Sequence, residues 1–196
     1  MEPITHLMTG ACLARAGFNR KAAYATLAMT LAAEMPDIDS LWSLDGPVAA
    51  LQHHRGWTHT FLGLPFEAAI LVGAIWLFDR WRSRRANPKP PRAPVRWRLL
   101  YCFTLIALLS HLFLDWTNNY GLRPFFPFNP RWYAGSFVFI FEPVLFLILL
   151  VALLALDDAD RLVLRAHRGN AGSSISARAS TRSPLSGLVE GRNPKS

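Results

Sequence analysis

Long apolar runs alternate with short polar segments along the chain. The runs cover residues 60–78, 99–114 and 137–156. A membrane-spanning helix needs about 20 mostly apolar residues, so the first and third runs have the length of a span. The second reaches that length if its flanking tryptophans act as interfacial anchors. The shorter, Ala-rich run at 22–36 is either a tightly packed span or a buried or re-entrant helix. Residues 4–17 predict a helix of about 21 Å, which is too short to cross a bilayer.

The composition favours a membrane protein. Of the 196 residues, 52% are hydrophobic and 17% are charged, whereas about 25% are charged in a typical soluble domain. The two cysteines, Cys12 and Cys102, lie in apolar stretches, which excludes a disulfide-rich secreted module. The pattern therefore predicts an all-α fold, namely a polytopic integral membrane helical bundle with about four spans plus a short N-terminal helix.

Basic residues gather in two of the segments that flank the apolar runs. The formal net charge is +8, from 21 Lys+Arg against 13 Asp+Glu. Most of the excess lies between the first two long runs, at 80–98, and after residue 156. By the positive-inside rule these segments face the cytoplasm, and residues 37–59 and 115–136 face the outside. This asymmetry accounts for the basic charge without nucleic acid, and no nucleic-acid recognition motif accompanies it.

The sequence predicts two parts that differ in order. Residues 1–156 form a membrane-embedded helical domain, and residues 157–196 form a basic, largely disordered cytoplasmic tail. From about residue 168 the chain is rich in Gly, Ser, Arg, Pro and Asn, and such a stretch cannot bury enough apolar surface to order itself.

The polar residues of the first part fall into a few short clusters. His111 and Asp115 are four residues apart and therefore share one helical face. Ionisable residues at membrane depth are costly and usually mark a functional site. Taken singly, each also has a structural explanation, such as an N-cap, a favourable helix-dipole interaction or an internal His–Asp pair. The clusters contribute His6, Asp37, Asp39, His54, Arg55, His59, His111, Asp115 and Glu142.

The predicted topology brings these clusters to one membrane surface, the outer one. Imidazoles mixed with carboxylates and without a thiolate suit Zn²⁺ or another borderline divalent metal. We therefore predict a site for one or two metal ions, with zinc favoured and manganese as an alternative. The predicted metal ligands are His6, Asp37, Asp39, His54, His59, His111 and Asp115.

A metal at such a site predicts hydrolytic chemistry. A bound divalent ion lowers the pKa of its water towards about 7 and polarises a phosphoryl oxygen. Arg55 offers a planar fork suited to a phosphate, and Glu142 is either a further ligand or the base that positions water. A site at the interface favours a phospholipid or a lipid-linked phosphate as substrate.

The order of these motifs resembles the YdjM-like family. The resemblance rests on H-x-x-x-G from His6, P-D-x-D at 36–39, H-R-G-x-T-H at 54–59, H-x-x-x-D at 111–115 and Glu142-Pro143, and it covers about residues 1–156. Members are described as LexA-regulated, membrane-bound, metal-dependent hydrolases of bacterial inner membranes. The resemblance therefore implies a protein of the inner membrane, and the predicted multi-pass topology then places the site on the periplasmic side.

A more distant likeness is to the zinc-dependent phospholipase C and P1 nuclease superfamily. Those all-helical enzymes order their ligands as His, Asp, His and then His-x-x-x-Asp, and this chain matches that order. Val138 stands where their last motif has a His, and Asn118 and Asn119 stand where a further His is expected. These departures favour one or two metals over a three-metal cluster.

Two alternatives come from a different class of protein, without catalysis. The chain could be a metal or proton carrier that uses the same polar residues, or a structural membrane component whose His and Asp residues pair internally. A carrier needs polar residues through to the cytoplasmic ends of its spans, and those halves contain almost none. The sequence leaves the oligomeric state open.

Overall fold

The computed structural model describes residues 2–46, 48, 55–85, 93–139 and 142–180. Its chain contacts form two compact units, Met1–Leu156 and Asp157–Ser196. The described part is helical, with two isolated β-bridges and no strands. Its elements are α1 (Pro3–Leu13), the π-helix η1 (Ala14–Phe18), α2 (Asn19–Lys21), α3 (Ala25–Ala32), the 3-10 helices η2 (Met35–Asp45) and η3 (Trp57–His59), α5 (Leu64–Ser83), α6 (Trp97–Thr117) and α7 (Pro143–Ser180).

The predicted all-α fold is confirmed for the described residues, but the number of spans is not. Among them, α6 alone is long and apolar enough to cross a membrane. The apolar run at 22–36 yields α3, which has only eight residues, or about 12 Å at 1.5 Å per residue. α5 carries Glu67 in its first turn and Arg80 and Arg82 in its last. The four-span arrangement therefore stays a prediction.

The last helix differs from the sequence-based expectation at both ends. It begins at Pro143 and not at residue 137. It continues to Ser180, past residue 168, where the composition predicts disorder. The first proline that could stop the helix is Pro184, and backbone hydrogen bonds within a helix are local, so few apolar side chains suffice to continue it. Residues 181–196, which include the rest of the predicted tail, lie outside the described residues.

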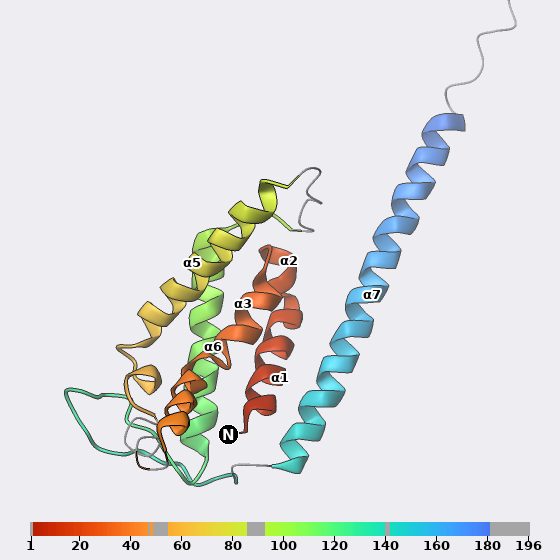
Figure 1. Cartoon of the computed structure of the whole chain (residues 1–196). Helices are drawn as coiled ribbons and strands as arrows, with labels where there is room; N and C mark the ends of the chain where they lie inside the picture. The colour runs from red at the N-terminus through yellow and green to blue at the C-terminus, as the bar shows by residue number, and fades with distance from the viewer. Residues whose placement is uncertain (1, 47, 49–54, 86–92, 140–141, 181–196) are drawn as a thin grey trace, which may run out of the picture. The chain divides into compact units, whose positions relative to one another are not determined.

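The helix α3 lies at the centre of the first unit. It packs against α1, α5 and α6 (Figure 1). Its buried positions and those just after it are mostly alanines, including Ala28, Ala32 and Ala33. Small side chains let neighbouring helix backbones approach closely. Because the helices pack this closely, the buried polar side chains near their ends contact one another.

The contact between α1 and α3 depends on a glycine. A Cβ atom on Gly10 would meet the carbonyl oxygen of Met29 and would lie 2.7 Å from the Cβ of Ala33. Glu2 fixes the start of α1, because its carboxylate accepts hydrogen bonds from the backbone N–H groups of Ile4 (2.8 Å) and Thr5 (3.1 Å). The close contact at Gly10 thus positions α1 against α3, and the Glu2 cap stabilises the start of α1.

We predict that Gly10→Ala lowers the free energy of unfolding by about 1–3 kcal/mol, since the new methyl group overpacks a rigid contact. Gly73→Ala is the matched control, because a Cβ at Gly73 in α5 meets nothing within 4 Å. That control should raise the free energy of unfolding by about 0.5–1 kcal/mol, because glycine weakens a helix interior. Thermal unfolding of both variants in detergent measures the difference. Equal effects would contradict the close packing of α1 on α3.

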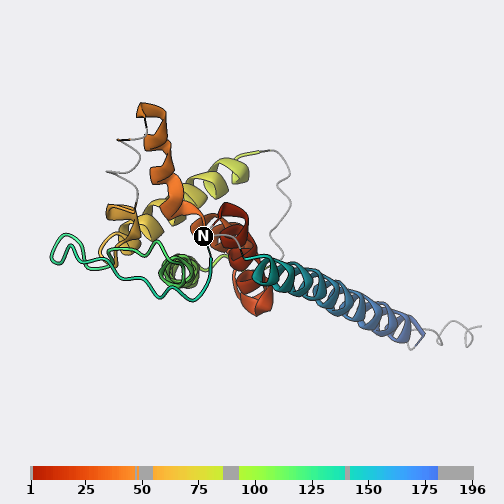
Figure 2. The same ribbon diagram turned by 90° about the horizontal axis from the view of Figure 1, so that it is seen from below.

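The buried face of α6 runs from an apolar start to a polar end. Leu100, Phe103, Ala107 and Leu108 pack in the core, and the same face then presents His111 and Asp115. The chain after α3 approaches this polar end through η2, which begins at Met35 with Pro36 in its first turn and projects from the end of α3 (Figure 2). The helical spacing of α6 thus fixes where the polar residues from other segments meet.

Candidate metal centre

Four residues from three segments converge at the end of α6. They are Asp37 of η2, His59 of η3, and His111 and Asp115 of α6, and each offers one ligand atom within 4.8 Å of the others. The side chains of His59, His111 and Asp115 are fully shielded from solvent, and that of Asp37 is 15% exposed. The group can therefore hold a metal ion away from bulk water.

The separations between these atoms suit tetrahedral coordination. Bonds of about 2.0–2.1 Å to zinc place tetrahedral ligand atoms about 3.3–3.4 Å apart. The Nε2 atom of His59 lies 3.2 Å from the Asp37 carboxylate, 3.2 Å from Nε2 of His111 and 3.4 Å from the Asp115 carboxylate. Nε2 of His111 lies 3.5 Å from Asp37 and 3.7 Å from Asp115. Five of the six distances between ligand atoms are thus close to those expected for tetrahedral zinc coordination.

The backbone fixes the orientation of the His111 ring. Its Nδ1 atom lies 2.7 Å from the carbonyl oxygen of Ala33. A carbonyl can only accept a hydrogen bond, so Nδ1 carries the proton and donates it. Nε2 then presents a lone pair towards His59. This arrangement of a donated N–H behind a ligating nitrogen is typical of metal-binding histidines.

The two aspartates of the P-D-I-D motif hold opposite sides of one imidazole. Asp37 faces Nε2 of His59 at 3.2 Å, and Asp39 faces Nδ1 at 3.3 Å. The Thr58 hydroxyl donates to Asp39 at 3.0 Å and lies 3.0 Å from the same Nδ1 atom. Nδ1–H of His59 therefore points at acceptors, and its Nε2 atom turns into the group of four.

The carboxylates around His59 make the centre attractive to a cation. Burial alone would lower the pKa of His59, but its hydrogen bonds to Asp115, Asp37 and Asp39 outweigh this and raise the pKa to about 10. Burial likewise disfavours the Asp37 carboxylate, yet its interactions with the His111 and His59 side chains hold the pKa of Asp37 well below its usual range. A site that binds a proton this strongly provides a negative, desolvated environment that also suits a metal ion.

Asp115 is held by side chains on both of its oxygens. His6 lies 3.4 Å from Oδ1, and its ring stacks on His111 with centroids 3.9 Å apart. The Arg55 guanidinium lies 2.9 Å from Oδ2. Asn118 donates to Oδ1 at 3.4 Å. These contacts leave the carboxylate little freedom to rotate away from the group of four.

Arg55 is buried beside this centre, with 5% of its surface exposed. Its Nη1 atom donates to the carbonyl oxygen of Gly121 and lies 3.5 Å from Oδ1 of Asn118. Its guanidinium lies over the Tyr120 ring at 4.7 Å. Its backbone has a positive φ of 56° and is fixed by a 2.7 Å hydrogen bond from its N–H to Asp39. Its Nε atom has no hydrogen-bond partner among the described residues.

The structure places the other predicted site residues differently. His6 and Asp39 lie against the group of four but contact it from behind, through Asp115 and His59. Glu142 is half-buried just before α7, and none of the described contacts of the centre involves its carboxylate. His54 lies outside the described residues. The roles of His6, Asp39, His54 and Glu142 as ligands or base stay predictions.

The sequence did not single out several groups that shape the centre. Thr58 bonds to Asp39, and Asn118, in the segment predicted to face the outside, bonds to Asp115, so both hold site residues. The carbonyl of Ala33, which fixes His111, is a backbone atom and carries no residue-type signal. The position of Thr58 beside His59, and of Asn118 one helical turn after Asp115, was the available indication.

A comparison with protein families matches a part of the chain that includes the whole centre. The family model described as YdjM inner membrane protein matches residues 1–181. The chain belongs to the YdjM inner membrane protein family. The matched range includes every residue of the centre described above, and the predicted resemblance to this family is confirmed. The more distant likeness to zinc-dependent phospholipase C and P1 nuclease is not shown by these comparisons.

This chain is also similar to a curated bacterial protein. It is 29% identical over 161 residues to the uncharacterized protein YfhP of Bacillus subtilis (strain 168). The match covers 78% of this chain and 45% of YfhP, so the chain spans less than half the length of that relative. No solved structure gives a significant match.

Proposed function

We propose that this protein is a membrane-bound, metal-dependent hydrolase of phosphoesters. The observation that carries the proposal is the convergence of four ligand atoms, from the buried His59, His111 and Asp115 and the partly exposed Asp37, within 4.8 Å of one another. Two imidazoles and two carboxylates suit zinc, or manganese as the alternative. The chemistry that such an ion supplies is activation of water and polarisation of a phosphoryl oxygen.

The chain's own residues would orient the ligands and exclude competing water. Ala33 and Asp39 hold the far nitrogens of His111 and His59, which keeps both Nε2 atoms aimed at one point. Outer contacts of this kind typically alter metal affinity about 10–100-fold when they are lost. Burial of the group lowers the local dielectric constant and strengthens every charge interaction in it.

Arg55 supports the choice of a phosphoester as the substrate class. Its guanidinium is held next to the centre by Asp115, at 2.9 Å, and its Nε–H lacks a hydrogen-bond partner among the described residues. A buried guanidinium with a donor to spare suits a phosphate oxygen. Arg55 would then orient the phosphoester, while its remaining donors keep Asp115 in place.

The proposal includes a location at the outer face of the inner membrane. Its support is the family of inner membrane proteins, the apolar helix α6 and the basic segments that favour a cytoplasmic position. About four spans, a periplasmic centre and a cytoplasmic C-terminal segment complete the arrangement. A centre at that interface favours a lipid or lipid-linked phosphoester.

Elemental analysis of the full chain purified in detergent tests the metal centre. Wild type should contain about one or two equivalents of zinc or manganese, and His59→Ala and Asp115→Ala should contain neither. Asp79→Ala is the matched control, because Asp79 lies away from the centre and accepts a hydrogen bond of 2.5 Å from the Tyr24 hydroxyl. It should keep its metal.

The same four proteins are then assayed with a chromogenic phosphodiester. We expect at least about a 100-fold loss of hydrolysis in His59→Ala and Asp115→Ala, as large as the loss of an outer contact or larger. Folded wild type without stoichiometric metal, even after reloading, would overturn the proposal. The His–Asp contacts would then be structural pairs.

A further inference from the structure

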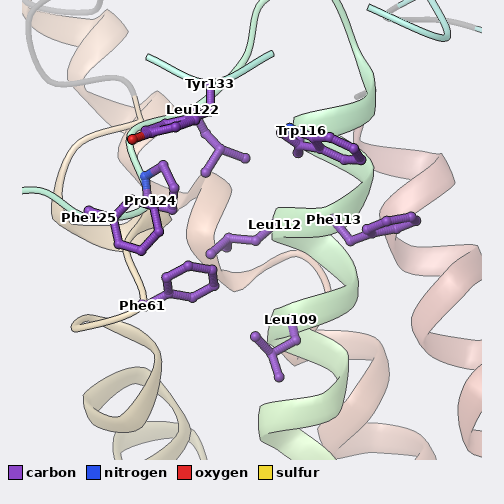
Figure 3. Close-up of a pocket in the computed structure, with 9 residues that line it drawn as sticks. All are labelled: Phe61, Leu109, Leu112, Phe113, Trp116, Leu122, Pro124, Phe125 and Tyr133. Atoms are coloured by element: carbon purple, nitrogen blue, oxygen red, sulfur yellow. The ribbon is translucent and has the colours of Figure 1, made fainter. Parts of the chain in front are cut away.

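An apolar pocket adjoins the metal centre. It lies between residues 109–116 of α6, Phe61 and the loop residues 122–133, and its volume is about 480 Å³ (Figure 3). Small-ligand sites usually measure about 300–1,000 Å³. The side chains that line it are all aliphatic or aromatic, apart from the tyrosine hydroxyl of Tyr133. The pocket therefore suits a hydrocarbon group of limited size.

Several residues that line the pocket are next or close in the chain to residues of the metal centre. Leu112 and Trp116 follow His111 and Asp115 on α6, and Leu122 follows Gly121, whose carbonyl accepts from Arg55. Phe61 comes two residues after His59. A molecule in the pocket is thus separated from the centre by the thickness of these backbone segments.

The loop side of the pocket is fixed by backbone hydrogen bonds. The N–H of Phe61 donates to the carbonyl of Pro124 at 2.9 Å. Leu122 and Tyr133 exchange two hydrogen bonds, each of 2.9 Å. The pocket wall is therefore already formed and does not require a partner to order it.

The helix side identifies the kind of occupant. Four of the lining residues lie on the last turns of α6, the helix whose length and hydropathy suit a membrane span. Phe113 and Leu109 are 61% and 46% exposed, so the pocket opens on the apolar surface of that helix. We expect this surface of an inner membrane protein to face lipid, with Trp116 at the level where tryptophans meet the headgroups. Lipid hydrocarbon is the molecule available at that opening.

We propose that the apolar pocket binds one acyl chain of a membrane phospholipid and so places its phosphoester at the metal centre. This inference rests on the proposed function for the role of the headgroup. It assigns a chain-binding site to α6 and the 122–133 loop, next to the ligands His111 and Asp115. Substrate selection then depends on the length and shape of the acyl chain.

Photo-crosslinking of the full chain in nanodiscs tests the pocket directly. The probe is phosphatidylethanolamine with a diazirine at the end of one acyl chain, in a phosphatidylethanolamine–phosphatidylglycerol bilayer. Crosslinks mapped by mass spectrometry should concentrate on Phe61, Phe125 and Tyr133. In Leu109→Trp the larger side chain should fill the opening of the pocket and reduce these crosslinks by at least about fourfold. This is the change in binding expected when the acyl chain buries one methylene group less.

Two further variants keep the test decisive. Leu77→Trp is the matched control, because Leu77 is 61% exposed on α5 and does not line the pocket. It should leave the pocket crosslinks unchanged. Phe125→Ala alters the half-exposed loop wall and should also reduce them, independently of any packing change in α6. Equal labelling of exposed α5 and α6 surfaces, unaffected by either pocket variant, would overturn the inference.

The metal variant separates this inference from the proposed function. Asp115→Ala should lose metal and hydrolysis while keeping the pocket crosslinks. Pocket crosslinks in a wild type that binds no metal would support the acyl-chain site and refute the hydrolase. Metal and hydrolysis without pocket crosslinks would support the hydrolase and refute the acyl-chain site.

Discussion

Zinc added to the metal-free protein at about a thousandfold above its dissociation constant should raise the free energy of unfolding by about 4 kcal/mol. For a chain of this size, that corresponds to about 8–16 °C in the unfolding temperature. The reason is that Asp37, His59, His111 and Asp115 aim lone pairs and negative charge at one buried point. The metal ion binds this group of four in the folded state and not the dispersed residues of the unfolded chain, so its binding free energy adds to the stability of the folded state.

Thermal unfolding in detergent, with and without metal, measures this stabilisation. His59→Ala should show little or no stabilisation by zinc, because the site then lacks the ligand that lies close to the other three, Asp37, His111 and Asp115. Magnesium is the ionic control, since it prefers six oxygen ligands and should stabilise wild type far less than zinc. An equal shift in wild type and His59→Ala would mean that the metal acts elsewhere.

Arg55→Met should lower the free energy of unfolding of the metal-free protein by about 3–5 kcal/mol. Arg55 and Asp115 form a buried ion pair at 2.9 Å, with 6% and 0% of their side chains exposed. Removing one partner leaves the other charge buried without compensation. The expected change in unfolding temperature is about 6–20 °C.

Arg123→Met is the matched control for this substitution. Arg123 lies over the rings of Phe126 (5.2 Å) and Trp132 (4.9 Å), so its loss should cost only about 0.5–1 kcal/mol. Zinc should recover part of the stability of Arg55→Met, since a metal ion also compensates Asp115. If the two arginine variants unfold at the same temperature, Asp115 does not depend on Arg55.

Some of the centre follows from spacing within single helices. His111 and Asp115 share a helical face because they are four residues apart, and the sequence predicts their proximity for that reason. The apolar face that precedes them on α6 predicts that they are buried. By contrast, the division of labour between Asp37 and Asp39, on opposite nitrogens of His59, depends on the 3-10 geometry of η2. No periodic pattern of side chains specifies that geometry.

The apolar run at 22–36 illustrates a limit of hydropathy. Hydropathy alone allowed a packed span or a buried helix, and the structure contains α3, an eight-residue helix in the centre of the first unit. Apolar residues signal removal from water, but they do not say whether lipid or protein replaces it. Here the small side chains of Gly10 and of the alanines in α3 allow close helix packing, so protein surrounds α3.

The sequence by itself determined the helical class and the apolar helix α6, because these depend on local periodicity and composition. The order of its motifs indicated the family and the residue types of the centre. The tertiary structure alone decided which donors meet. It placed the Ala33 carbonyl behind His111, brought Arg55 to Asp115 and formed the apolar pocket beside them. These contacts join residues far apart in the chain, and only the packing of whole helices fixes the distances between them.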